Sequence, residues 1–241
     1  MKKPIIGMIS PRNTSEDRTF DNYTKFINTY PKRIIETGGI PIGLVFPNGK
    51  FEIDQMELCD GFVLQGGPII ESTQINTVKY AVDKKKPILG ICLGMQTMAG
   101  YNWVYNELGN TTYKEIENFF KPEYEDYFLE KKEGHNQVDP FYTSQIEKSK
   151  HIIILDKKSQ LYKIYNTEII REPSLHKFVV KDSAFDNSKL FKVVGKSIDD
   201  TIEVVEGLDP NHFMIGVQFH PELEEKNNIL FKKLIKEAKN K

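Results

Sequence analysis

Short apolar runs alternate with longer amphipathic segments along most of the chain. Each run is bounded by Gly, Pro or polar residues, which is typical of a buried strand. The predicted strands cover residues 5–9, 40–45, 61–64, 88–91, 152–155, 178–180, 191–197, 201–205 and 213–219. This alternation predicts βαβ units, and therefore an α/β fold with a mostly parallel sheet and helices on both faces.

The amphipathic segments predict helices over residues 23–37, 73–84, 95–105 and 227–238. Pro31 falls inside the first of them and is expected to kink or divide it. Apolar residues recur at helical spacing in the last one, which predicts a packing face. Residues 113–141 are rich in Glu, Lys, Phe and Tyr without clear periodicity, so we expect a surface loop near the rim of the active site.

Composition places the chain among soluble enzymes. Its 241 residues are 39% hydrophobic, enough for a core, and predict a single domain spanning residues 1–241. The apolar runs are too short to cross a bilayer, and the first one passes at once into polar residues, unlike a signal peptide; we therefore expect a cytoplasmic protein without a membrane partner. The net charge of −1 offers no reason to expect nucleic acid as a partner.

The segment GICLGMQ, residues 90–96, has the strand, turn and helix context of a nucleophile elbow. A nucleophile at the tip of such a turn, here Cys92, crowds the positions on either side, which explains Gly90 and Gly94. The helix that follows supplies N–H groups and a positive dipole end that favour the thiolate. The N–H of Leu93 is placed to bind an oxyanion. The alternative is a buried core cysteine, the role we expect for Cys59.

The segment GVQFHPE, residues 216–222, is an apolar strand that ends at His220 and is followed by an acid. Together with the elbow it supplies a thiol, a base and a carboxylate, the parts of a Cys92–His220–Glu222 catalytic triad. Ligands of open α/β sheets bind at the carboxyl ends of the strands. We therefore expect Cys92, His220 and the Gly66-Gly67 pair to meet in one crevice.

Both segments resemble the elbow and His-Pro-Glu motifs of class I glutamine amidotransferase-like proteins. The segments PIIGMIS, IIETGGIPIGLVFP, DGFVLQGG, ELGNTTYKEI, SLHKFVV and DDTIEVVE are similar, in order, to the γ-glutamyl hydrolase (γ-glutamyl-γ-aminobutyrate hydrolase-like) branch. The resemblance implies a flavodoxin-like, doubly wound fold. Two departures stand out: Leu93 occupies a position where that branch commonly has arginine, and residues 68–70 replace a longer glycine-rich loop. Leucine at this position resembles the glutaminase domains of amidotransferases.

The resemblance also implies roles for residues around the triad. The N–H of Gly67 would join that of Leu93 in the oxyanion hole, although the Gly-Gly pair also suits an ordinary turn. Gly66, Gln96 and His176 would line the substrate site; Gln96 could equally be a polar helix residue and His176 a half-buried strand histidine. We expect His135 at the surface or anchoring a loop, and structural roles for His151 and His212.

The sequence shows no zinc-ligand spacing, calcium loop, P-loop or dinucleotide fingerprint, so neither a metal nor a cofactor is expected. The first hypothesis is hydrolysis of a small-molecule γ-glutamyl amide through a thioester, with γ-aminobutyrate, a polyamine derivative or a peptide as leaving amine. One alternative is an amidotransferase glutaminase that passes ammonia to a separate synthase partner. Another is a catalytically silent binding protein. Base rates favour a homodimer.

Overall fold

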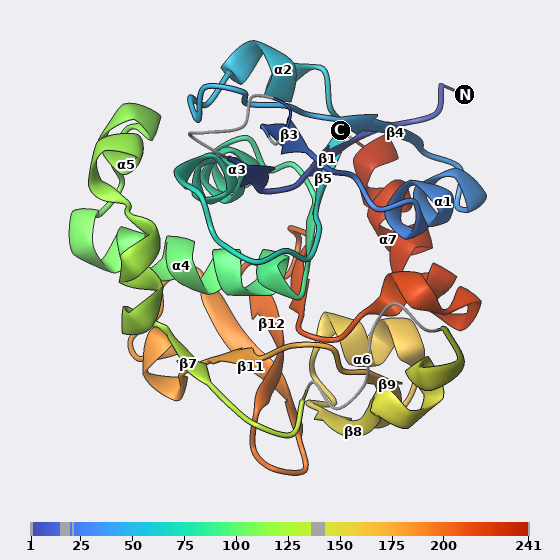
Figure 1. The fold of residues 1–241 in the computed structure, drawn as a ribbon. Helices are drawn as coiled ribbons and strands as arrows, with labels where there is room; N and C mark the ends of the chain where they lie inside the picture. Colours follow the sequence, from blue (N-terminus) through green and yellow to red (C-terminus); the bar gives the residue numbers. More distant parts are fainter. Residues whose placement is uncertain (1, 15–19, 21, 136–142, 241) are drawn as a thin grey trace.

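The computed structural model describes residues 2–14, 20, 22–135 and 143–240, and a nine-stranded sheet forms its centre (Figure 1). From one edge to the other the strands are β4 (Ile40–Gly43), β1 (Ile5–Ile9), β5 (Gly61–Leu64), β6 (Ile88–Ile91), β13 (Met214–Val217), β12 (Ile202–Gly207), β11 (Phe191–Ser197), β8 (Lys150–Leu155) and β9 (Ile169–Pro173). Neighbours from β4 to β13 pair in parallel, and those from β13 to β9 pair antiparallel. The predicted flavodoxin-like α/β fold is confirmed, with an antiparallel extension beyond its parallel strands.

Helices cover both faces of the sheet (Figure 1). A separate hydrophobic core lies between the sheet and each layer of helices. One face carries α1 (Thr29–Glu36), α6 (Gln160–Tyr165) and α7 (Asn228–Lys239); the other carries α3 (Ser72–Asp83) and α4 (Leu93–Leu108), with α5 (Tyr113–Phe119) against α3. Successive side chains of a strand point to opposite faces, so Ile88 packs in the α3–α4 core and Leu89 in the α1–α7 core. None of the helices in the described ranges is both long and apolar enough to cross a membrane.

Short elements complete the structure. They are α2 (Ile53–Glu57), the strand pair β2 (Arg12–Asn13) and β3 (Tyr23–Thr24), the pair β7 (Leu129–Lys131) and β10 (Phe178–Val180), and the 3₁₀ helices Pro122–Tyr127, Thr143–Ser149, Asp182–Phe185, Pro221–Leu223 and Glu225–Asn227. These elements are too short for their residues to show a helical or strand periodicity in the sequence.

The first helix is shorter than predicted. Residues 23–24 form β3, and α1 begins only at Thr29. Pro31 therefore lies in the first turn of α1, where its missing N–H would have no intrahelical partner, and it does not kink or divide the helix.

The prediction of a surface loop over residues 113–141 is wrong for its described part, which holds α5, a 3₁₀ helix and β7. A capping box starts α5, because Thr112 Oγ1 accepts the N–H of Glu115 and the Glu115 carboxylate accepts the N–H of Thr112. Aromatic packing holds the segment against α4, with ring centroids of Trp103 and Phe119 5.6 Å apart. Residues 136–141 lie outside the described residues.

Candidate active site

Cys92 lies at a sharp turn between β6 and α4. Its backbone has φ 54° and ψ −109°, a conformation that L-residues rarely adopt. A Cβ on Gly90 would lie 2.5 Å from the carbonyl oxygen of Gly94, and one on Gly94 would lie 2.4 Å from the carbonyl oxygen of Leu64. Both glycines are therefore required by backbone crowding, as the elbow motif predicted.

His220 and Glu222 lie just beyond β13 and are hydrogen-bonded to each other. His220 Nδ1 is 2.7 Å from Glu222 Oε1. Since an ionised carboxylate only accepts, Nδ1 carries the proton and Nε2 is the nitrogen available to Cys92. Within the described part of the chain, Nε2 has no hydrogen-bond partner of ordinary geometry. Burial lowers the pKa of His220, but the charges of Glu222 and then Cys92 outweigh it and leave that pKa well above its usual value.

Replacing Glu222 by glutamine should lower the pKa of His220, because the amide keeps an acceptor for Nδ1 but removes the negative charge. In the parent protein, the pKa of His220 is higher in the folded state than the unfolded value of about 6.5, so protonated His220 stabilises the fold. This contribution has its full size below about pH 6.5. This stability is lost as the pH rises through the folded pKa. The Glu222→Gln protein should show less of this loss, measured as the unfolding midpoint from pH 6 to 10.

The exposed Glu225, which is close in sequence, provides the control, since Glu225→Gln should keep the parental pH dependence. Titration of the His220 ring by NMR reads the same change directly. An unchanged His220 pKa in Glu222→Gln would contradict the assignment of Glu222 as its charge partner.

Gly66 marks the point where the distant parts of the site meet. A Cβ placed there would lie 3.3 Å from His220 Cε1, 3.3 Å from the Tyr30 hydroxyl and 3.5 Å from Cys92 Cβ. The structure thus brings Cys92, His220 and the end of β5 together at the carboxyl edge of the parallel strands, in the crevice that the sequence predicted.

Helix α1 contributes two residues that the sequence analysis missed. The N–H of Gly66 donates to the Tyr30 hydroxyl at 3.0 Å, and Arg33 Nε donates to the carbonyl oxygen of Glu222 at 3.0 Å. Both side chains are buried. Burial, followed by the Glu222 carboxylate, raises the pKa of Tyr30 well above its usual value. In the sequence, the spacing of Tyr30 and Arg33 by one helical turn indicates only that they share a helix face. It does not show which residues they contact.

A pocket of about 430 Å³ opens beside the thiol. It is lined by Gly67, Pro68, Cys92, Leu93, Gln96, Glu125, Leu129, Leu175, His176, Lys177 and Phe178. Neither the N–H of Gly67 nor that of Leu93 has an acceptor among the residues described here. A Cβ on Gly67 would lie 2.6 Å from Pro11 Cγ, which explains glycine at this position.

Gln96 and His176 line this pocket, and each has one side-chain nitrogen that contacts the protein. Gln96 Nε2 donates to the carbonyl oxygen of Phe178 at 3.0 Å and to Gln218 Oε1 at 3.1 Å. His176 Nδ1 lies 3.1 Å from the same Phe178 oxygen, and burial lowers the pKa of its ring. Both side chains therefore hold β10 in place. His176 is buried just before β10 and is not a half-buried strand histidine, and contact of Gln96 or His176 with a substrate stays a prediction.

Of the two positions expected for His135, the surface position is wrong and the loop-anchoring position agrees with the structure, because the residue is buried in a loop that its hydrogen bonds hold. Its ring is 6% exposed, with Nδ1 3.3 Å from Ser174 Oγ and Nε2 3.0 Å from Asp199 Oδ2. His212 Nε2 lies 2.7 Å from the carbonyl oxygen of Lys86, in keeping with a structural role. The position of His135 results from packing against strands far along the chain, which local sequence does not reveal.

Comparison with known proteins agrees with this geometry. Residues 71–222 match the Peptidase C26 family. CTP synthase 1 of Danio rerio is 31% identical over 181 residues, which cover 72% of this chain and 30% of that protein. The chain thus spans about a third of the length of the curated relatives it matches.

Two solved structures share the fold. The glutaminase domain of Trypanosoma brucei CTPS, solved with bound acivicin, superposes with a TM-score of 0.65 at 15% identity and covers 99% of this chain and 94% of its own. A glutamine amidotransferase from Thermotoga maritima gives a TM-score of 0.59 at 12% identity and covers 100% and 98%. At these identities the likeness establishes the class I glutamine amidotransferase-like fold.

Proposed function

Because the chain belongs to the Peptidase C26 family, within the class I glutamine amidotransferase-like superfamily, we propose that it hydrolyses the γ-amide of glutamine and delivers ammonia to a synthase. The observation that carries the proposal is the meeting of Cys92, His220 and Glu222 beside one pocket. The curated relatives that match are CTP synthases, and a solved neighbour is a CTPS glutaminase domain. This support places the glutaminase reaction ahead of the γ-glutamyl hydrolase reaction that the sequence suggested first.

In the proposed reaction, the Cys92 sulfur attacks the γ-carbonyl carbon and His220 accepts the thiol proton. The Glu222 carboxylate accepts the hydrogen bond of the His220 Nδ1–H and stabilises the imidazolium, in keeping with the raised pKa of His220. The carbonyl oxygen becomes an oxyanion, which the N–H groups of Gly67 and Leu93 are proposed to bind. His220 then gives its proton to the leaving nitrogen as the C–N bond breaks.

The second half of the reaction releases the glutamyl group. Ammonia leaves, and the γ-carbon remains bound to Cys92 as a thioester. Water then attacks the thioester carbon while His220 removes one of its protons. The C–S bond breaks, glutamate departs and the thiol recovers its proton from His220. Glutamine and water are the reactants that balance these steps.

A γ-glutamyl hydrolase is the second candidate, and the size of the pocket favours it. At about 430 Å³ the pocket lies within the range of roughly 300–1,000 Å³ that is usual for larger ligands. Lys177 and Glu125 add charges of both signs to its lining. A substituted amine could therefore replace ammonia as the leaving group. A silent binding protein is disfavoured by the complete Cys92, His220 and Glu222 set.

A panel of substrates separates these functions. We expect the purified protein to release glutamate and ammonia from L-glutamine, faster when a synthase partner is added, and to cleave γ-glutamyl-γ-aminobutyrate slowly. The measurement is glutamate and ammonia formed per enzyme over time. Fast cleavage of a substituted amide with little from glutamine would instead establish the hydrolase. No release from any amide, with or without a partner, would contradict both reactions.

A further inference from the structure

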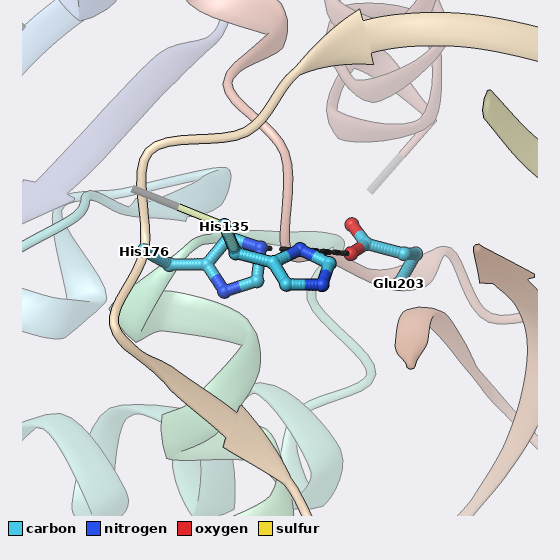
Figure 2. A group of neighbouring side chains, drawn as sticks. All are labelled: His135, His176 and Glu203. Atoms are coloured by element: carbon cyan, nitrogen blue, oxygen red, sulfur yellow. Dashed lines mark ion pairs between the residues drawn. The ribbon is translucent and has the colours of Figure 1, made fainter. Parts of the chain in front are cut away.

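A second polar cluster is buried on the antiparallel side of the active-site pocket. Glu203 of β12 is fully buried, and its Oε1 lies 3.5 Å from His176 Nε2 and 3.8 Å from His135 Nδ1. Its other oxygen, Oε2, lies 3.3 Å from His151 Nε2. Figure 2 shows the His135 and His176 rings beside the Glu203 carboxylate, with both dashed ion pairs drawn to that side chain.

Outer hydrogen bonds orient both rings toward Glu203. His176 Nδ1 faces the carbonyl oxygen of Phe178 at 3.1 Å, and His135 Nε2 faces Asp199 Oδ2 at 3.0 Å. Since both partners are acceptors, each of these two nitrogens carries a proton. His176 Nε2 then faces Glu203 Oε1 at 3.5 Å, and His135 Nδ1 lies 3.8 Å from the same oxygen and 3.3 Å from Ser174 Oγ. Donation of the outer ring N–H to a carbonyl or carboxylate is the usual support of a metal-binding histidine.

Several polar atoms of this cluster lack partners. Among the described residues, both carboxylate oxygens of Glu203, His176 Nε2 and His151 Nε2 are buried without a hydrogen bond. Buried polar atoms are rarely left without a hydrogen-bond partner. A bound ion or water is one explanation for those that are. A nitrogen lone pair that faces a carboxylate is repelled by it unless a proton or a metal ion lies between them.

We infer that His135, His176 and Glu203 form a binding site for a divalent transition-metal ion of the Zn²⁺ class. Imidazole and carboxylate are common zinc ligands, and tetrahedral bonds of about 2.0–2.1 Å place ligand atoms about 3.3 Å apart. The observed 3.5 Å and 3.8 Å separations need only a small contraction. Two histidines and one carboxylate leave a fourth position for water, as in open zinc sites.

The three ligand side chains are buried, and two pockets reach the histidines of the cluster. A separate pocket of about 230 Å³ is lined by His135, His151 and Asp199 among others. His176 belongs to the cluster and also lines the pocket beside Cys92. A bound ion would hold His176 in place and tie the segment leading into β10 to β12, so its role is to position the pocket wall.

Calorimetric titration of Zn²⁺ into the Cys92→Ala protein tests the site, because this background removes the thiol as a competing zinc ligand. We expect one Zn²⁺ per chain, and Co²⁺ should give the visible absorption of a tetrahedral site. Glu203→Gln in the same background should weaken binding by more than the roughly 100-fold that loss of a supporting residue costs. Glu206→Gln is the matched control on β12, since Glu206 instead accepts the N–H groups of Gln160 and Leu161.

Two further variants test the site in case Glu203→Gln fails to fold. His135→Gln and His176→Gln, each in the Cys92→Ala background, should lose the Co²⁺ band and weaken Zn²⁺ binding similarly. The absence of equimolar binding by the Cys92→Ala protein would overturn the inference. Binding that survives His135→Gln and His176→Gln unchanged would overturn it as well. Neither readout depends on amide hydrolysis, so the proposed function can fail separately.

Discussion

Replacing Cys92 by alanine should lower glutamate release by about 10⁴-fold or more while the protein keeps its fold. The loss is large because the thioester cannot form without the sulfur, and His220 and the N–H groups of Gly67 and Leu93 then have no nucleophile to assist. The fold should persist because alanine leaves the crowded backbone at Gly90 and Gly94 unchanged. Steady-state glutamate release and circular dichroism measure the two effects.

The other cysteine provides a matched control. Cys59 is fully buried and packs near Gly7, and burial raises the pKa of its thiol to about 12. It is therefore unreactive at neutral pH, in keeping with the structural role predicted for it. Cys59→Ala should cost some stability through a small cavity but keep full turnover. Cys92→Ala with parental turnover, or Cys59→Ala with a comparable loss, would refute the assignment of the nucleophile.

Replacing Gly94 by alanine should destabilise the fold by about 3 kcal/mol, a large part of the stability of an ordinary domain. The new methyl group would lie 2.4 Å from the carbonyl oxygen and 2.7 Å from the Cβ of Leu64 on β5. Neither atom can move without shifting the strand next to the elbow. Chemical denaturation of the purified variant measures the change in the free energy of unfolding.

Gly207→Ala is the control for the general cost of adding a methyl group. Its nearest neighbour is the Met214 Cβ at 3.1 Å, and the backbone there is not in the left-handed region. We expect a cost of about 1 kcal/mol or less. Equal stabilities for Gly94→Ala and Gly207→Ala would show that the elbow is less crowded than the structure indicates.

The elbow and the His-Pro-Glu segment were predictable because their chemistry is local. Gly90 is crowded by the backbone of Gly94 four residues on, and Glu222 reaches His220 two positions away, whereas the contact that crowds Gly94 comes from Leu64 of β5. The parallel strands were predictable for a similar reason, since each is a short apolar run. The expectation that Gly66 lies near Cys92 required only the rule that strand ends share one edge of the sheet.

Features that depend on distant packing were not predictable. The strand β12 is buried along its whole length, so its residues show no alternation that distinguishes antiparallel from parallel pairing. Tyr30 and Arg33 act through contacts with Gly66 and Glu222, far along the chain. The proposed metal ligands His135, His176 and Glu203 come from three separate segments, so no ligand spacing within one segment indicates them.

Covalent capture at Cys92 tests the central claim most directly. The purified protein is incubated with the glutamine analogue diazo-oxo-norleucine, digested and analysed by mass spectrometry, with Cys92→Ala in parallel. The account predicts one adduct, on the peptide that contains Cys92, with simultaneous loss of glutamate release and an unmodified Cys59. Glutamate release that persists while Cys92 stays unmodified, or an adduct retained in Cys92→Ala, would contradict it.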